Sequence, residues 1–399
     1  GEGIGGIQMV HFSQNTFQDL EKHLLKLEQQ AVADGYDGLE GIVLDLRDNP
    51  GGYLSQALHV SDKFLESGVI VSTMGHGRQR GELHEATRYG TESDMRLVVL
   101  VDSGSASASE IFAGAIRNLD RGVIVGVTSF GKGSVQNLYP FHADGSALKL
   151  TIDKYFTPGG FSIQSVGITP DIELRPVWVD DEGDLYFYWQ DAMMREQDLD
   201  DHLASGEEGE PSSLTCLYLD PDNPLWSEEF DRDQPDDMES WGAEFQVQFA
   251  KTILQSSSSP DRKRMLTESY PAVQQLIADE NAKLTARFEE VGVDWTADSA
   301  GGTPKARVSM EIGNDSGVLA VGERTPVTLT IENTGDGPFV RLRAMAESEL
   351  IEGREFLFGR IEPGETRSWS IYLEPSLGMT SRTDEVTFHF YADGSRAPG

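Results

Sequence analysis

Residues 97–116 have the sequence LVVLVDSGSASASEIFAGAI, in which a run of aliphatic residues is followed by a turn of small residues and then by a helical pattern. The run 97–101 contains only Val and Leu, which is typical of a strand buried on both faces of a parallel sheet. Apolar side chains then recur with helical spacing, at Ile111, Phe112, Ala115 and Ile116. The stretch therefore predicts a strand, a tight turn and a helix.

The same alternation extends over residues 1–175. Further runs with the composition of buried strands are Ile42–Leu46, Val69–Ser72 and Val123–Val127. Helical stripes lie between them, at Phe17, Leu20, Leu24 and Leu27 and again at Leu54, Leu58, Phe64 and Leu65. Asn15 precedes the first stripe, with Gln18 three residues later, close to a capping box. Strands that alternate with helices predict βαβ crossovers and an α/β domain.

The composition changes near Pro176, and residues 176–303 predict an acidic region made mainly of helices and loops. Its acidic clusters are Asp180–Glu182, Asp198–Asp201 and Asp231–Asp237. None of them has the ligand spacing of a calcium loop, so a solvated surface is the simpler interpretation. In residues 304–399 apolar side chains recur with a period of two, for example at Val327, Leu329 and Ile331. This period predicts an antiparallel β-sandwich with no chemistry of its own.

Composition limits the classes of function. The 399 residues suit two or three domains, and 38% hydrophobic residues can form a sizeable core. With 32 basic against 67 acidic side chains, the net charge of −35 disfavours nucleic-acid and anionic-membrane partners. No run approaches the ~18 apolar residues of a membrane span, and no charged leader with an apolar stretch opens the sequence. The single cysteine, Cys216, cannot form an internal disulfide and leaves the redox compartment open.

The familiar hydrolase motifs H-E-x-x-H and G-x-S-x-G are absent, and Cys216 lies among acidic residues that disfavour a thiolate. The turn Gly104–Glu110 is a better candidate because its small residues would let a substrate backbone approach closely. Ser107 would lie at the start of the helix, where free N–H groups favour a developing oxyanion. The alternative is ordinary N-capping by one of the serines 105, 107 or 109.

A second candidate segment, Phe130–Gln136, follows the strand pattern 123–127 and places Lys132 between two glycines. The lysine could be an exposed loop residue or a phosphate binder, but a P-loop requires Ser or Thr where Gly133 stands. The two segments make better sense together, because a serine hydroxyl needs a base. A lysine can serve if burial lowers its pKa from about 10.4 to roughly 7–8.

Six motifs follow one another in a characteristic order: DLRDNPGG at 45–52, GSASASE at 104–110, FGKGSVQ at 130–136, YFTPGG at 155–160, SIQ at 162–164 and GITPD at 167–171. In this order the chain resembles the carboxyl-terminal processing proteases, also called tail-specific proteases. The resemblance covers residues 4–175, and several linked motifs are far more specific than any one alone.

This resemblance implies a serine endopeptidase with a Ser–Lys dyad that cleaves peptide bonds near the C-terminal tails of proteins. It implies Ser107 as nucleophile, Lys132 as general base and Gln136 as the residue that orients the lysine. The oxyanion hole would be formed by the amide of Ala108 and that of Gly51 or Gly52. No cofactor or metal is expected, and a periplasmic or secreted location is implied; the oligomeric state stays open.

Two departures from the family pattern matter. Many members carry an aspartate eleven residues after the serine, where this chain has Asn118. Members also usually carry a PDZ domain before the segment that corresponds to Gly5–Phe12, and we expect this domain to be either lost or upstream of the sequence shown. A non-catalytic binding or scaffold protein that retains the protease fold is therefore the alternative function.

Overall fold

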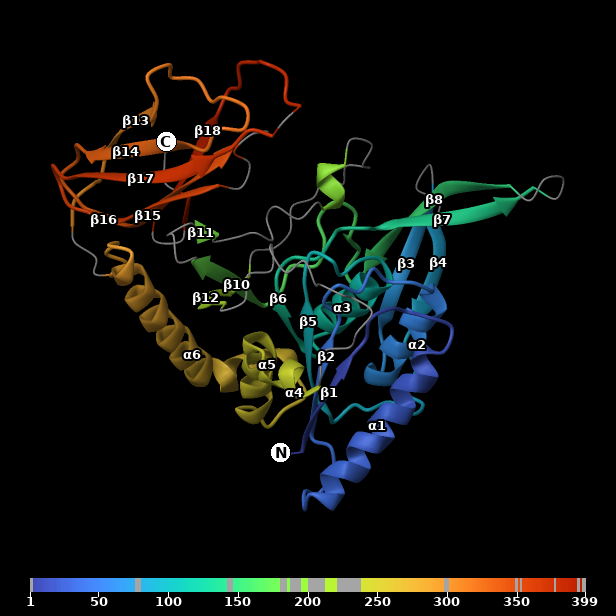
Figure 1. Cartoon of the computed structure of the whole chain (residues 1–399). Coiled ribbons are helices and arrows are strands. Elements are labelled where there is room, and N and C mark those ends of the chain that lie inside the picture. Colours follow the sequence, from blue (N-terminus) through green and yellow to red (C-terminus); the bar gives the residue numbers. More distant parts are fainter. Residues whose placement is uncertain are drawn as a thin grey trace. The chain divides into compact units, whose positions relative to one another are not determined.

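The computed structural model divides the chain into two compact units (Figure 1), of which unit 1 comprises residues 1–175, 193–216 and 230–277, and unit 2 the remainder. The residues that the structure describes are 3–75, 80–141, 146–179, 185–186, 195–199, 212–220, 238–297, 301–348, 351, 354–376, 378–392 and 395–396. The acidic clusters 180–182 and 231–237, and Asp200 and Asp201 of the third, lie outside them. Residues 176–303 do not form one body, because the two units share them.

A parallel sheet forms the centre of unit 1. Its strands in spatial order are β1 (Ile4–Gln8), β2 (Gly41–Asp45), β5 (Arg96–Val101), β6 (Val123–Gly126) and β10 (Ile172–Val179). The connecting helices are α1 (Thr16–Ala33), α2 (Leu54–Phe64) and α3 (Ala108–Asn118). Every residue of β2 and β6 is buried, as their aliphatic composition predicts. The predicted α/β core is thus confirmed, and α1 begins after Asn15 although this side chain makes no capping hydrogen bond.

A second sheet, which the sequence did not reveal, is antiparallel. Its strands in order are β4 (Arg80–Glu85), β3 (Val69–Gly75), β8 (Ala147–Thr157) and β7 (Ser134–Pro140), with the short β9 (Phe161–Ser162) beside β8. The expectation that Val69–Ser72 is buried on both faces was wrong, because Val69 and Ser72 are only half-buried. Ile70 and Val71 still pack into the main core.

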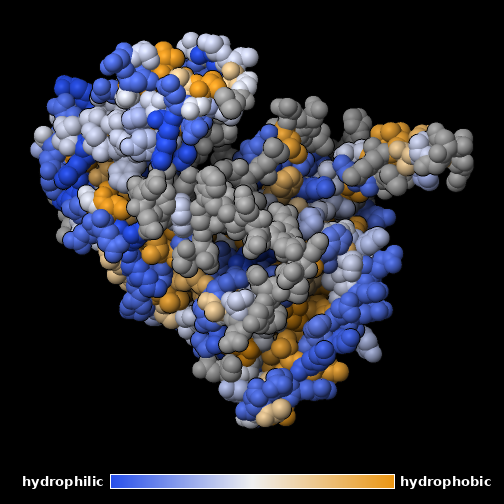
Figure 2. Space-filling model, in the orientation of Figure 1, coloured by the Kyte–Doolittle hydropathy of each residue, from blue (hydrophilic) through white to orange (hydrophobic). Residues whose placement is uncertain are grey.

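The β7–β8 hairpin projects from unit 1 (Figure 1) and carries exposed apolar side chains, including Tyr139, Phe141, Leu148 and Leu150. Figure 2 shows hydrophobic surface on this arm. The base of the hairpin lies next to the glycine–lysine loop, since β7 begins two residues after Lys132.

The remaining helices are α4 (Met238–Ala243), α5 (Phe245–Gln255) and α6 (Arg262–Glu290), and a 3₁₀ turn, η3, spans Glu196–Asp198. Helix α4 docks on the parallel sheet through Trp241, whose indole N–H donates to Asp45 Oδ2 over 2.8 Å. Arg47 pairs with the same carboxylate at 2.7 Å and with Glu244 at 2.6 Å. These contacts fix the start of the loop that carries Gly51 and Gly52.

Unit 2 contains two antiparallel sheets and the ends of elements that begin in unit 1. One sheet consists of β13 (Ala306–Ile312), β14 (Thr325–Asn333) and β17 (Thr366–Leu373). The other consists of β16 (Glu355–Ile361), β15 (Phe339–Glu347), β18 (Thr387–Ala392) and β19 (Ser395–Arg396). The short strands β11 (Leu185–Tyr186) and β12 (Leu214–Leu219) pair with β10. Inward-facing side chains of both three- and four-stranded sheets, such as Leu329 and Phe356, share one hydrophobic cluster.

Candidate active site

Ser107 occupies a strained turn between β5 and α3. Its backbone has φ 56° and ψ −109°, a conformation that residues other than glycine rarely adopt. Strain of this kind persists only where the surroundings enforce it, and it is concentrated at functional sites. The side chain is half-buried at the start of a buried helix, where N–H groups and the helix dipole favour negative charge.

The loop after β2 holds this turn in place. The Asn49 carbonyl accepts hydrogen bonds from the Ala106 amide at 3.0 Å and from the Ser109 hydroxyl at 2.9 Å. On the other side, Asp102 accepts from the amides of Asp48, Gly104 and Ser105. Burial and the neighbouring Asp48 raise the pKa of Asp102 to about 6. The turn is therefore tied to the loop after β2 through both Asp48 and Asn49 before any substrate arrives.

Glu110, one turn into α3, connects Ser107 to the glycine–lysine loop. Its Oε2 accepts from the Ser107 amide and from the Lys132 amide, each at 2.8 Å. Its Oε1 accepts from the Ser129 hydroxyl and from the Gly131 amide, each at 2.6 Å. Because one oxygen receives both amides, the backbones of Ser107 and Lys132 lie side by side.

The Glu110 carboxyl is fully buried, and burial raises its pKa to about 7. The four donors act in the opposite direction and lower the pKa, because they stabilise the charged form. At neutral pH the group therefore lies close to the midpoint between its charged and neutral forms.

Glycine is required on both sides of Lys132. Gly131 has φ +98°, in the left-handed region, and a Cβ at Gly133 would lie far inside van der Waals contact with the Gln164 backbone. Lys132 itself is half-buried. The loop can follow this path only because neither neighbour carries a side chain.

Two of the predicted oxyanion-hole residues, Gly51 and Ala108, lie within contact distance of each other. A Cβ on Gly51 would lie 2.8 Å from the Ala108 nitrogen and 2.9 Å from Ser107 Cβ, so this glycine packs directly on the nucleophile turn. The Gly51 amide, however, donates to Asn49 Oδ1 at 2.9 Å. No hydrogen bond of the Gly52 or Ala108 amide is found among the described residues. The Gly51 amide is therefore already engaged, and the Gly52 amide is not engaged in this part of the chain.

The predicted site residue Gln136 and the departure from the family pattern, Asn118, both lie away from this cluster. Gln136 is exposed on β7, and no hydrogen bond joins it to Lys132 in the described part of the chain. Asn118 ends α3, about 16 Å along the helix from Ser107. Its amide nitrogen donates to Thr157 Oγ1 at 3.0 Å and to the Pro158 carbonyl at 3.2 Å.

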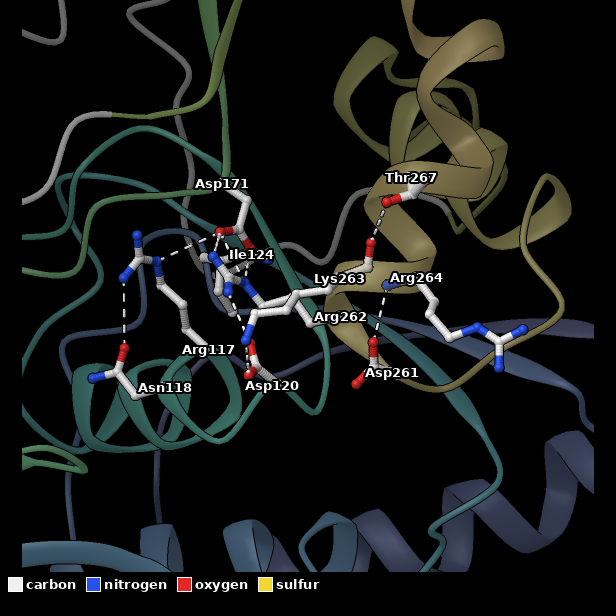
Figure 3. A network of polar contacts seen from close by, with 10 residues as sticks. All are labelled: Arg117, Asn118, Asp120, Ile124, Asp171, Asp261, Arg262, Lys263, Arg264 and Thr267. Carbon is white, nitrogen blue, oxygen red and sulfur yellow. Dashed lines mark hydrogen bonds and ion pairs between the residues drawn. The ribbon is translucent and has the colours of Figure 1, made fainter.

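Asn118 also adjoins a network of charges (Figure 3) that links the end of α3 to the start of α6. Arg117 approaches Asp171 at 3.5 Å, and Arg262 pairs with Asp171 and with Asp120. Asp171 is buried and also accepts from the Ile124 amide at 2.9 Å. Position 118 thus belongs to the packing behind the site and does not reach the reacting atoms.

Sequence reasoning missed three residues that shape the site, namely Glu110, Asn49 and Gln164. Ser107 and Glu110 do have the spacing of a capping box, which the structure contains. That signal could have identified Glu110, but only as a helix cap. Nothing in the sequence pattern shows that the same carboxylate also accepts hydrogen bonds from the amides of Gly131 and Lys132.

Within the described ranges, no group of three or more His, Cys, Asp or Glu side chains is placed to hold a metal ion. Among the same residues, no helix combines the length and the apolar character needed to cross a bilayer.

Comparison with known proteins supports the resemblance drawn from the sequence. Residues 3–174 match the model of Peptidase family S41. The chain is 39% identical over 221 residues to a carboxy-terminal-processing protease of Bartonella bacilliformis, covering 55% of this chain and 48% of that protein. It is 39% identical over 172 residues to a carboxyl-terminal-processing protease of Synechocystis sp., covering 43% of this chain and 38% of that protein.

Among solved structures, that of a photosystem II D1 C-terminal processing protease is 32% identical, with a TM-score of 0.39, and the match covers 43% of this chain and 42% of that one. The chain therefore spans half or less of the length of these relatives. For residues 3–174, the predicted relationship to the carboxyl-terminal processing proteases is confirmed.

Proposed function

We propose that this chain hydrolyses peptide bonds near the C-terminal tails of proteins, with Ser107 as nucleophile and Lys132 as general base. The observation that supports this best is the shared hydrogen-bond acceptor, Glu110 Oε2, which brings the Ser107 and Lys132 backbones together. The strained backbone of Ser107 and the family match add independent support.

In this mechanism the neutral Lys132 amine takes the proton of the Ser107 hydroxyl while Oγ attacks the scissile carbonyl carbon. The negative charge that develops on the carbonyl oxygen is received by the amides of Ala108 and Gly52, aided by the N-terminal end of α3. The protonated amine then gives its proton to the leaving nitrogen, and an acyl-enzyme forms on Ser107. Water, deprotonated by Lys132, releases the acyl group and restores the hydroxyl.

Glu110 is a positioning residue in this scheme, because its hydrogen bonds come from three backbone amides and the Ser129 hydroxyl and reach no reacting atom. A nucleophile and a base on two separate loops react efficiently only if their relative placement is fixed. Gln136 does not contribute to that placement in this structure, so we assign it no role in orienting Lys132. By the same family resemblance, we propose that the protein acts in the periplasm or outside the cell.

The test compares the intact protein with Ser107→Ala and Lys132→Ala on a fluorogenic peptide that ends in a free carboxylate. We expect both variants to lose at least about a thousandfold in kcat, as removal of a member of a catalytic unit does. Lys26→Ala, an exposed change on α1, is the matched control and should keep wild-type activity. Equal turnover by all four proteins would refute the assignment. Tail binding without cleavage by the unmodified protein would indicate the non-catalytic alternative.

A further inference from the structure

The lysine loop is also held by a segment from outside the part of the chain that matches the peptidase family. Residues 195–199 belong to unit 1 and follow the family match by some twenty positions. The Glu196 amide donates to the Phe130 carbonyl at 3.1 Å. The Arg195 guanidinium donates to the Ser129 carbonyl at 3.2 Å through Nε and to the Val166 carbonyl at 2.7 Å through Nη2. The segment therefore joins the loop that contains Lys132 to the loop that contains Val166.

A second path runs through the buried side chain of Gln164. Its Nε2 donates to Glu196 Oε1 at 2.9 Å, and its Oε1 accepts from the Gly133 amide at 3.2 Å. A carboxylate can only accept, so Glu196 requires the NH₂ group of Gln164 to face it. The carbonyl oxygen of Gln164 must then face Gly133. Glu196 thus determines the orientation in which Gln164 can hold the residue after Lys132.

The segment is itself a defined local structure. Asp198 Oδ2 accepts from the Arg195 amide at 2.8 Å, and the Asp198 amide donates back to the Arg195 carbonyl at 3.0 Å. This reciprocal turn presents Arg195 and Glu196 together. With Glu110 holding the amides of Gly131 and Lys132, both sides of the lysine are then fixed.

We propose that Arg195 and Glu196 are positioning residues for the general base: they hold the loop that contains Lys132, and they do so from a segment that the family match does not include. The inference rests on the proposed function. Neither residue reaches a reacting atom, so their loss should slow the chemical step without weakening substrate binding.

The experiment compares Glu196→Ala, Glu196→Gln and Arg195→Ala in the full chain. We expect Glu196→Ala and Arg195→Ala to lower kcat about tenfold with KM unchanged, because placement of the base is lost. Glu196→Gln can still accept from Gln164 through its amide oxygen and should keep activity within about threefold of wild type. Glu28→Ala is the matched control. Glu28 lies on α1, and its carboxylate accepts a hydrogen bond from the Leu39 amide at 2.6 Å, so this change also removes a hydrogen-bonded carboxylate.

Amide hydrogen exchange supplies a readout that does not depend on turnover. In Glu196→Ala and Arg195→Ala, the peptide covering residues 130–136 should exchange faster, and the one covering 97–101 should be unchanged. Unaltered kcat and unaltered exchange in both variants would overturn the positioning role of Arg195 and Glu196 while leaving the proposed function intact. An equal loss of kcat in Glu28→Ala would also overturn it. If wild type shows no turnover, the proposed function fails. The exchange result alone then decides whether Arg195 and Glu196 hold the loop that contains Lys132.

Discussion

Glu110→Gln replaces one carboxylate oxygen by an NH₂ group at the point where the Ser107 and Lys132 amides meet. The wild-type carboxylate accepts four hydrogen bonds, two at each oxygen. In the variant, one of these positions becomes a donor that faces either two amides or an amide and a hydroxyl. Both hydrogen bonds are lost where the NH₂ group faces the two amides. Where it faces the Gly131 amide and the Ser129 hydroxyl, the hydroxyl can accept from it and only one is lost. The shape of the side chain is retained.

Two opposing terms determine the cost in stability. A hydrogen bond to a buried charged group contributes about 1.5–3 kcal/mol, so losing one or two costs about 1.5–6 kcal/mol. The variant also removes a charge whose burial raises the pKa from 4.5 to about 7. That shift corresponds to about 3 kcal/mol, which the neutral amide does not lose. The raised pKa already includes the effect of the four hydrogen bonds, so the two terms largely offset each other. The free energy of unfolding should therefore change by no more than about 3 kcal/mol above pH 7.

Activity should suffer far more than stability. A displacement of about 1 Å between nucleophile and base can cost about a hundredfold, and we expect this loss in kcat for Glu110→Gln. Peptide hydrolysis and chemical unfolding are measured on the same preparation. Glu355→Gln is the control, because it changes a buried carboxylate that pairs with Arg343 at 2.9 Å in unit 2. Retention of more than half of the wild-type kcat by Glu110→Gln would refute the positioning role.

Three further predictions concern the pKa of Glu110, the packing around Gly51 and the ion pairs of Asp171. Because the pKa of Glu110 is raised to about 7 in the folded state, the unfolded state ionises first, and this group should lower the stability of wild type by about 3 kcal/mol between about pH 4.5 and 7; in urea unfolding the fall over this range should be about 3 kcal/mol smaller in Glu110→Gln, in which the raised pKa of Asp102 still acts. Gly51→Ala, which places a Cβ 2.5 Å from the Ala106 carbonyl oxygen, should abolish peptide cleavage, whereas Gly35→Ala, with φ +93° and open space, should retain it. Arg262→Ala leaves buried Asp171 without its closest ion pair (Figure 3) and should lower the unfolding free energy of unit 1 by about 3 kcal/mol in urea, whereas Lys263→Ala, an exposed change, should alter it by less than about 0.5 kcal/mol.

The elements that the sequence predicts well are those with local signals. The buried strands β2, β5 and β6 consist mostly of Val, Ile and Leu, and α3 follows its turn without interruption. The pairing of the Ser107 hydroxyl with the Lys132 amine is predicted from chemistry, since a hydroxyl requires a base, and it stays a prediction; the structure gives the shared acceptor of their backbone amides. That the Gly51 amide donates to Asn49 Oδ1 could not be predicted, because no sequence pattern indicates this contact.

Contacts without a periodic signal could not be predicted. The antiparallel sheet could not be predicted, because β3 and β8 pair across some eighty residues and both carry polar side chains. Glu110 has the sequence signature of a helix cap, which conceals its bonds to the lysine loop. Arg195 and Glu196 lie in an acidic stretch whose composition suggests only a solvated surface. Their contacts with residues 129–166 depend on tertiary structure alone.

The most direct test of the central claim is covalent modification of the nucleophile. The intact protein is treated at neutral pH with an alkyl fluorophosphonate, and the peptide containing residues 97–116 is analysed by mass spectrometry. The proposed dyad predicts a single adduct on Ser107, and Lys132→Ala should prevent it. An unmodified Ser107 in wild type, or an adduct that forms equally fast without Lys132, would contradict the mechanism.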